Sequence, residues 1–136
     1  MPTKCSGSWR RCESPPDPAP VTFRGAADPR FEQGLAEFRA GRFFQAHEEW
    51  EHLWNDSSGD DRVFLQALIQ LAAGCVHLAR RNRAPAERLF ALALEKLDRL
   101  PGGFAPFRLD GLREALRSPL PEGESTTADP RDRFAL

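Results

Sequence analysis

Apolar residues recur at helical spacing through most of the chain between residues 28 and 100. Asp28 followed by Pro29 is typical of a helix start, because an aspartate caps free amide groups and proline suits the first helical position. Phe31 and Phe38 then lie on one helical face until Gly41, which ends the pattern. The sequence therefore predicts a first helix between these two boundaries.

Three further helices are expected from the same reasoning. Residues 42–55 contain no helix breaker and end at the polar run 55–59, which predicts the second helix. Apolar positions cover most of the circumference of residues 63–79, and two aspartates just before them favour a helix N-terminus. The third helix is therefore expected to be the most buried. A fourth is predicted over residues 85–100.

Together these segments predict a compact all-α bundle of four to five helices, made of two αα-hairpins. The connections after Gly41 and around Asn82 are short, and the two segments look alike at a spacing of about 40 residues. Two such units are fewer than a solenoid needs, so a closed bundle is favoured. Asp110 as a cap, with Leu112 and Leu116, predicts a short fifth helix. No strand pattern competes.

The two ends of the chain have a different composition. Residues 1–27 and 118–136 are rich in proline, glycine, serine and charges, and such segments bury too little apolar surface to offset their chain entropy. We expect a disordered Pro-rich leader (1–27), one helical bundle domain (28–117) and a disordered tail (118–136).

Charge and cysteine content narrow the partners and the compartment. The net charge of -1 offers no field for nucleic acid or for a membrane surface, so neither partner is expected. Cys5, Cys12 and Cys75 are odd in number and do not suggest a disulfide scaffold. A secretory signal and an apolar run of about 18 residues are both lacking. We predict a cytoplasmic monomer or homodimer, with a protein partner left open.

Chemistry-bearing residues concentrate on the second predicted helix. At about 100° per residue, His47 falls within the apolar face beside Trp50 and Trp54, Glu51 lies one turn further on the same side, and Glu48 lies at the flank. An imidazole and a carboxylate on a buried face need partners, because leaving either unpaired is costly. We therefore expect a buried polar pair of His47 and Glu51.

Three interpretations of this pair stay open. In the structural one, Glu51 accepts a hydrogen bond from His47 or from a buried arginine such as Arg62, and the pair fixes helix packing. In the second, Gln66, Gln70 and His77 of the third helix face the second helix. His47, Glu51 and His77 would then form a set suited to divalent iron, zinc or manganese. In the third, an apolar pocket beside His47 holds a small ligand.

The ordered series His47-Glu48-x-x-Glu51-x-x-Trp54, then Gln66, Gln70 and His77, resembles the family of domains of unknown function numbered 309. The resemblance runs over about residues 35–97. It implies a compact all-helical fold and names no reaction. The residues that look like family hallmarks, and that form the candidate polar site, are His47, Glu48, Glu51, Trp54, Gln66, Gln70 and His77. Gly74 and Pro85 depart from the pattern.

These observations favour an uncharacterised bundle with a buried His/Glu polar site, acting as a structural or interaction module. The alternative is a metal- or small-ligand-binding protein that uses His47, Glu51 and His77, with metal-dependent hydrolysis as one outcome. The chain has no nucleophile motif, phosphate loop or complete zinc signature, which counts against an enzyme. Whether the protein is an enzyme is left open. Beyond a divalent metal, no cofactor is indicated.

Overall fold

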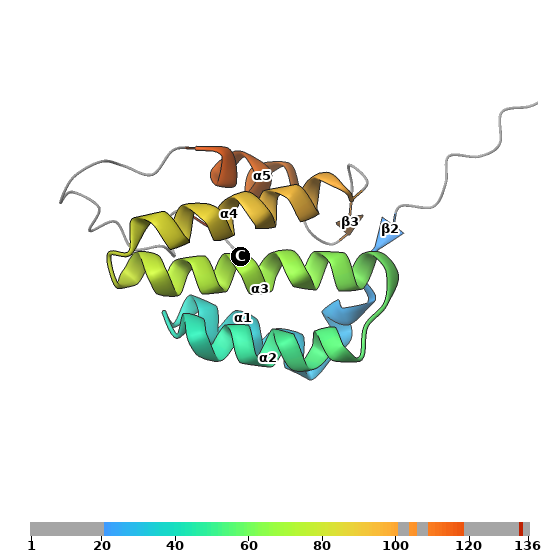
Figure 1. Ribbon diagram of the computed structural model, residues 1–136. Coiled ribbons are helices and arrows are strands. Elements are labelled where there is room, and N and C mark those ends of the chain that lie inside the picture. Colours follow the sequence, from blue (N-terminus) through green and yellow to red (C-terminus); the bar gives the residue numbers. More distant parts are fainter. Residues whose placement is uncertain (1–20, 101–103, 106–108, 119–133, 135–136) are drawn as a thin grey trace, which may run out of the picture.

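The computed structural model describes residues 21–100, 104–105, 109–118 and 134. Five α-helices dominate it: α1 (Pro29–Arg39), α2 (Phe43–Asn55), α3 (Gly59–Ala79), α4 (Arg83–Asp98) and α5 (Leu109–Arg117). Figure 1 shows α3 running through the middle, with α1 and α2 on one side and α4 and α5 on the other. The predicted all-α bundle is confirmed.

The core forms where these helices bury their apolar faces against α3, which contacts both α2 and α4. Trp50 is fully buried, and its indole N–H donates to the Phe31 carbonyl oxygen at 3.3 Å. Gly34 makes this packing possible, since a Cβ there would lie 2.5 Å from Trp50 Cδ1. Gly74 likewise leaves room for the ring of Phe90. The glycine in the middle of α3 therefore has a packing role.

The turns after α1 and α3 share one geometry. Gly41 (φ 85°) and Arg81 (φ 62°) both adopt the left-handed conformation just past a helix end. In each turn the next amide, that of Arg42 or Asn82, donates at 2.8 Å to a carbonyl five residues earlier. This is the Schellman arrangement, which satisfies carbonyls that the helix leaves free. The similarity of the two turns thus extends to their hydrogen bonds.

The segment before α1 belongs to the folded part, although its composition placed it in the leader. Residues Arg24–Ala27 form a short 3-10 helix, η1, and Phe23 is 1% exposed between Phe31 and Phe64. β2 (Val21–Thr22) also pairs in parallel with β3 (Phe104–Ala105). Two-residue strands are too short to show an alternating pattern. The predicted boundary at residue 28 is therefore too late, and residues 1–20 lie outside the described part.

The carboxyl-terminal segments also contribute to the core. Arg113 of α5 is 8% exposed and donates to the carbonyl oxygens of Leu97 (2.6 Å) and Leu100 (3.2 Å) at the end of α4. Phe134, from the predicted tail, is 1% exposed and packs on Phe90. The other predicted tail residues beyond Ser118 are outside the described part. The apolar content of the tail alone did not indicate that one of its side chains is buried.

Among the described helices, α3 is long and apolar enough to cross a membrane by length and composition alone. No such run was expected from the sequence. Here the apolar side chains of α3 pack against α2 and α4, and the core helix of a globular bundle meets the same criteria. The cytoplasmic location and the partner assignments stay predictions.

Candidate functional site

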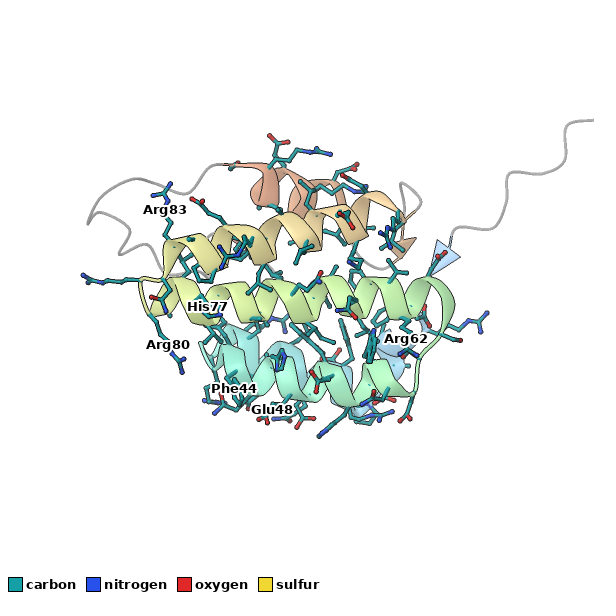
Figure 2. The ribbon with its side chains drawn as sticks, in the orientation of Figure 1. Phe44, Glu48, Arg62, His77, Arg80 and Arg83 are labelled. Atoms are coloured by element: carbon teal, nitrogen blue, oxygen red, sulfur yellow. The ribbon has the colours of Figure 1, made fainter. Side chains whose placement is uncertain are left out.

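The candidate site lies along the seam between α2 and α3. The two helices are joined by residues 56–58, and the seam runs from Trp54 and Arg62 at one end to Phe44 and His77 at the other. Figure 2 shows His77 and Arg80 on α3 across from Phe44 and Glu48 on α2. His77 of α3 therefore lies on the side of that helix that faces α2.

The His47–Glu51 pair is present, but it is not a buried pair. His47 Nε2 lies 3.5 Å from Glu51 Oε2, and their side chains are 25% and 52% exposed. The expectation of a buried carboxylate is wrong: Trp50 and Leu53 in the same turn are buried, whereas the side chain of Glu51 is more than half exposed. Glu48 is also exposed. The histidine is thus the half-buried member of the pair.

A pocket of about 210 Å³ opens beside His47 at one end of the seam. It is lined by Phe44, His47, Ala73, Val76, His77 and Arg80. Two of these residues, His47 and His77, are sites predicted from the sequence, and the pocket brings them together. Glu48, Glu51, Trp54, Gln66 and Gln70 do not line it.

Unpartnered polar atoms gather on this seam. Within the described part of the chain, five buried side-chain nitrogen or oxygen atoms have no hydrogen-bond partner in the protein. Four of them are on α2 and α3: His47 Nδ1, Trp54 Nε1, Gln70 Oε1 and His77 Nδ1. The fifth, Nε of Arg113, belongs to α5 and lies 3.5 Å from a carboxylate oxygen of Asp98. Buried polar atoms are nearly always satisfied, so this concentration needs an explanation.

The opposite end of the seam has a different character. The guanidinium of Arg62 lies over the ring of Trp54, with 3.8 Å between Cζ and the ring centroid. This cation–π contact covers the indole with a charged group. It also shows that Arg62 interacts with Trp54 rather than serving as the partner that the structural interpretation gave to Glu51.

The proposed metal set is not assembled in the described residues. They contain no group of three or more His, Cys, Asp or Glu side chains arranged to hold an ion. Glu51 pairs with His47 on the seam but does not reach the pocket that His77 lines. His47, Glu51 and His77 therefore do not form the three-ligand site that the sequence suggested.

Reasoning from the sequence missed Phe44, Ala73, Val76 and Arg80 as site residues. Phe44 lies three positions before His47, and Arg80 lies three positions after His77, so each shares a helical face with a histidine. This three-residue spacing could have indicated that Phe44 and Arg80 lie beside the two histidines. An aromatic residue in an apolar helical pattern is usually interpreted as core, whereas Phe44 is 53% exposed.

The fold and site define a small helical bundle with a pocket and several polar side chains along the seam between α2 and α3. The family model named Domain of unknown function (DUF309) matches residues 31–89, so the resemblance to that family is confirmed over this segment. All six pocket residues lie within it. No curated protein and no solved structure matches the chain.

Proposed function

We propose that this protein binds a small organic ligand in the pocket between α2 and α3, with His47 and His77 as its polar contacts. One observation carries the proposal: both histidines line the same pocket, and each keeps a buried ring nitrogen without a protein partner. A buried polar group left unsatisfied costs about 1 to 3 kcal/mol. A ligand that hydrogen-bonds to these rings recovers part of that cost.

The size and walls of the pocket agree with such a ligand. Its volume of about 210 Å³ is below the range of roughly 300 to 1,000 Å³ that accommodates drug-sized molecules. Phe44, Ala73 and Val76 provide apolar walls, and His47, His77 and Arg80 are the other three lining residues. Small-molecule sites generally combine an apolar lining with a few placed polar groups. A compact metabolite suits these dimensions better than a nucleotide or a peptide.

The other interpretations lose support on specific grounds. The structural one required a buried carboxylate, and Glu51 is more than half exposed. Metal-dependent hydrolysis required three ligands that the described residues do not bring together. An interaction module stays a prediction, since the exposed side chains of Phe44 and Leu92 alone name no partner.

Filling the pocket tests the proposal. Ala73→Leu places extra carbon atoms inside the cavity, whereas Ala36→Leu adds the same atoms to an exposed position on α1. We would screen small neutral and charged metabolites against the full chain by ligand-observed NMR. Compounds that bind should lose affinity for Ala73→Leu by at least about tenfold and keep it for Ala36→Leu.

Two results would contradict the proposal. One is a screen in which no compound binds the wild-type chain. The other is a set of ligands whose affinity is unchanged by Ala73→Leu, because such ligands occupy another surface. Thermal unfolding of both variants establishes that each is folded.

A further inference from the structure

We infer that the ligand of this pocket is a small monocarboxylate whose short hydrocarbon body lies among Phe44, Ala73 and Val76 while its carboxylate faces Arg80 and His77. This inference rests on the proposed function and adds the chemical class of the ligand.

Arg80 brings an uncompensated positive charge to the pocket. It is exposed and lines the cavity, and its guanidinium forms no hydrogen bond or ion pair with any described residue. Arg42 and Arg83, by contrast, are held by carboxylates: Arg42 lies 2.6 Å from Glu37, and Arg83 lies 2.6 Å from Glu87. A guanidinium free of protein partners can form two parallel hydrogen bonds with a carboxylate ligand.

The acidic groups nearest the pocket do not cancel this charge. Glu51 is paired with Nε2 of His47, at 3.5 Å, and Glu48 is exposed on the flank of α2. Neither residue lines the cavity. Glu51 occupies only Nε2 of His47, so Nδ1 of His47 and Nδ1 of His77 remain for polar contacts, and Arg80 is the charged residue that lines the pocket.

The helix ends beside the pocket also favour an anion. Phe44 lies in the first turn of α2, which has no side-chain cap and no acidic residue. The free amide groups of such a turn carry a partial positive charge. The C-terminal end of α3 also lies beside the pocket, and there the carbonyls of Val76, His77 and Leu78 already accept hydrogen bonds from the backbone of the turn that follows. The negative end of α3 is therefore partly neutralised.

The apolar walls select against a bare inorganic anion. Phe44 and His47 stack with 5.8 Å between ring centroids, so one wall is a flat, largely apolar surface. A phosphate ion would leave these walls unused and would have to give up more hydration than a singly charged carboxylate. A carboxylate attached to a short aliphatic or aromatic body matches both the charge and the lining.

The test compares matched pairs of ligands that differ in charge and hardly in shape. Benzoate with benzamide, and hexanoate with hexanamide, are titrated into the full chain while two-dimensional NMR spectra are recorded, and inorganic phosphate serves as the head group alone. We expect each carboxylate to bind at least about tenfold more tightly than its amide, since charge-assisted hydrogen bonds are worth roughly twice neutral ones.

Two charge-matched variants locate the effect. Arg80→Gln should weaken benzoate at least about tenfold and leave benzamide nearly unchanged. Arg81→Gln removes the same charge from the same turn, but Arg81 does not line the pocket, so benzoate affinity should stay within about twofold of the wild type. Both positions are exposed, and the NMR spectra of the variants report directly on folding.

Each outcome decides between the two proposals. Three results would overturn the carboxylate inference but not the proposed ligand site. They are equal binding of acid and amide, tighter binding of phosphate than of benzoate, and normal binding of benzoate by Arg80→Gln. If none of the four paired ligands binds, and no compound in the screen of neutral and charged metabolites binds, the proposed function fails as well.

Discussion

At the scale of single residues, solvent exposure decides what a polar side chain contributes. The Glu51 carboxylate is 52% exposed and 3.5 Å from an imidazole that is itself only partly buried. Water solvates such a carboxylate well, and exposed ion pairs are worth little. His47 and His77 differ from Glu51, since each has one ring nitrogen that is buried and has no hydrogen-bond partner in the protein.

We therefore predict that Glu51→Ala leaves stability nearly unchanged. The free energy of unfolding in urea should differ from that of the wild type by about 0.5 kcal/mol or less, because the substitution removes an exposed group. A loss above about 2 kcal/mol would restore the structural interpretation of the pair. Glu48→Ala, one turn along the same exposed flank, is the matched control.

At the scale of elements, the helix ends rest on local backbone conformation. The turn after α1 has Gly41 in its left-handed position, whereas the turn after α3 has Arg81 in the equivalent place. A residue with a Cβ is strained there by about 1 to 2 kcal/mol, and glycine is not. The two turns are thus the same structure at different conformational cost.

This difference predicts opposite effects of two substitutions. Arg81→Gly should raise the free energy of unfolding by about 0.5 to 1 kcal/mol, the relief of strain being partly offset by greater freedom of glycine in the unfolded chain. Gly41→Ala should lower it by about 1 kcal/mol. Chemical denaturation measures both, and a stabilising Gly41→Ala would contradict the assignment of these turns.

The start of α1 is sensitive to pH. Hydrogen bonds from the Arg30 side chain, and then from its backbone N–H, hold the pKa of Asp28 below its usual range. A lowered folded-state pKa contributes stability that is present above the ordinary value near pH 4 and is lost as the pH falls through the folded value. The cap therefore stabilises α1 at neutral pH and weakens in acid.

Asp28→Asn isolates this contribution, because asparagine can still cap the helix but does not ionise. The stability difference between the wild type and Asp28→Asn should be largest near pH 7 and should shrink below about pH 4. Urea unfolding across this pH range measures it. Glu32→Gln, an exposed first-turn substitution on the same helix, should show a much smaller change; equal behaviour of the two would argue against the Asp28–Arg30 contact.

At the scale of the whole molecule, the bundle is completed by segments outside the four long helices. Phe23 lies against Phe31 and Phe64, with ring centroids 4.9 and 4.8 Å apart. Its edge-to-face contacts join the segment before α1 to the central helix. The domain therefore includes part of what composition alone assigned to the leader.

Removing this aromatic ring should be costly. Phe23→Ala is expected to lower the free energy of unfolding by about 3 to 5 kcal/mol, the usual loss for a buried phenylalanine. Phe44→Ala, at an exposed phenylalanine, should cost about 0.5 kcal/mol. If Phe23→Ala is too unstable to measure, Phe23→Leu gives a smaller loss in the same direction. Equal stability of the two alanine variants would show that residues before α1 are not part of the core.

Much of the fold was predictable because its evidence is local. The sequence Asp28–Pro29 marks the start of α1, which begins at Pro29, and the second helix was placed within one residue of α2. The candidate site was predicted in part: His47 and His77 share a pocket, but Glu51 lies outside it. The angular positions of side chains around one helix do not reveal how much of each side chain a neighbouring helix buries.

By itself, the sequence determined the all-α class and the approximate helix boundaries, because capping residues and apolar periodicity act within one or two turns. Only the tertiary structure decided that Glu51 is exposed, that Phe23 and Phe134 are buried, and that Arg80 joins the two histidines at one pocket. These properties depend on contacts between segments far apart in the chain, and the pattern within one segment does not contain them.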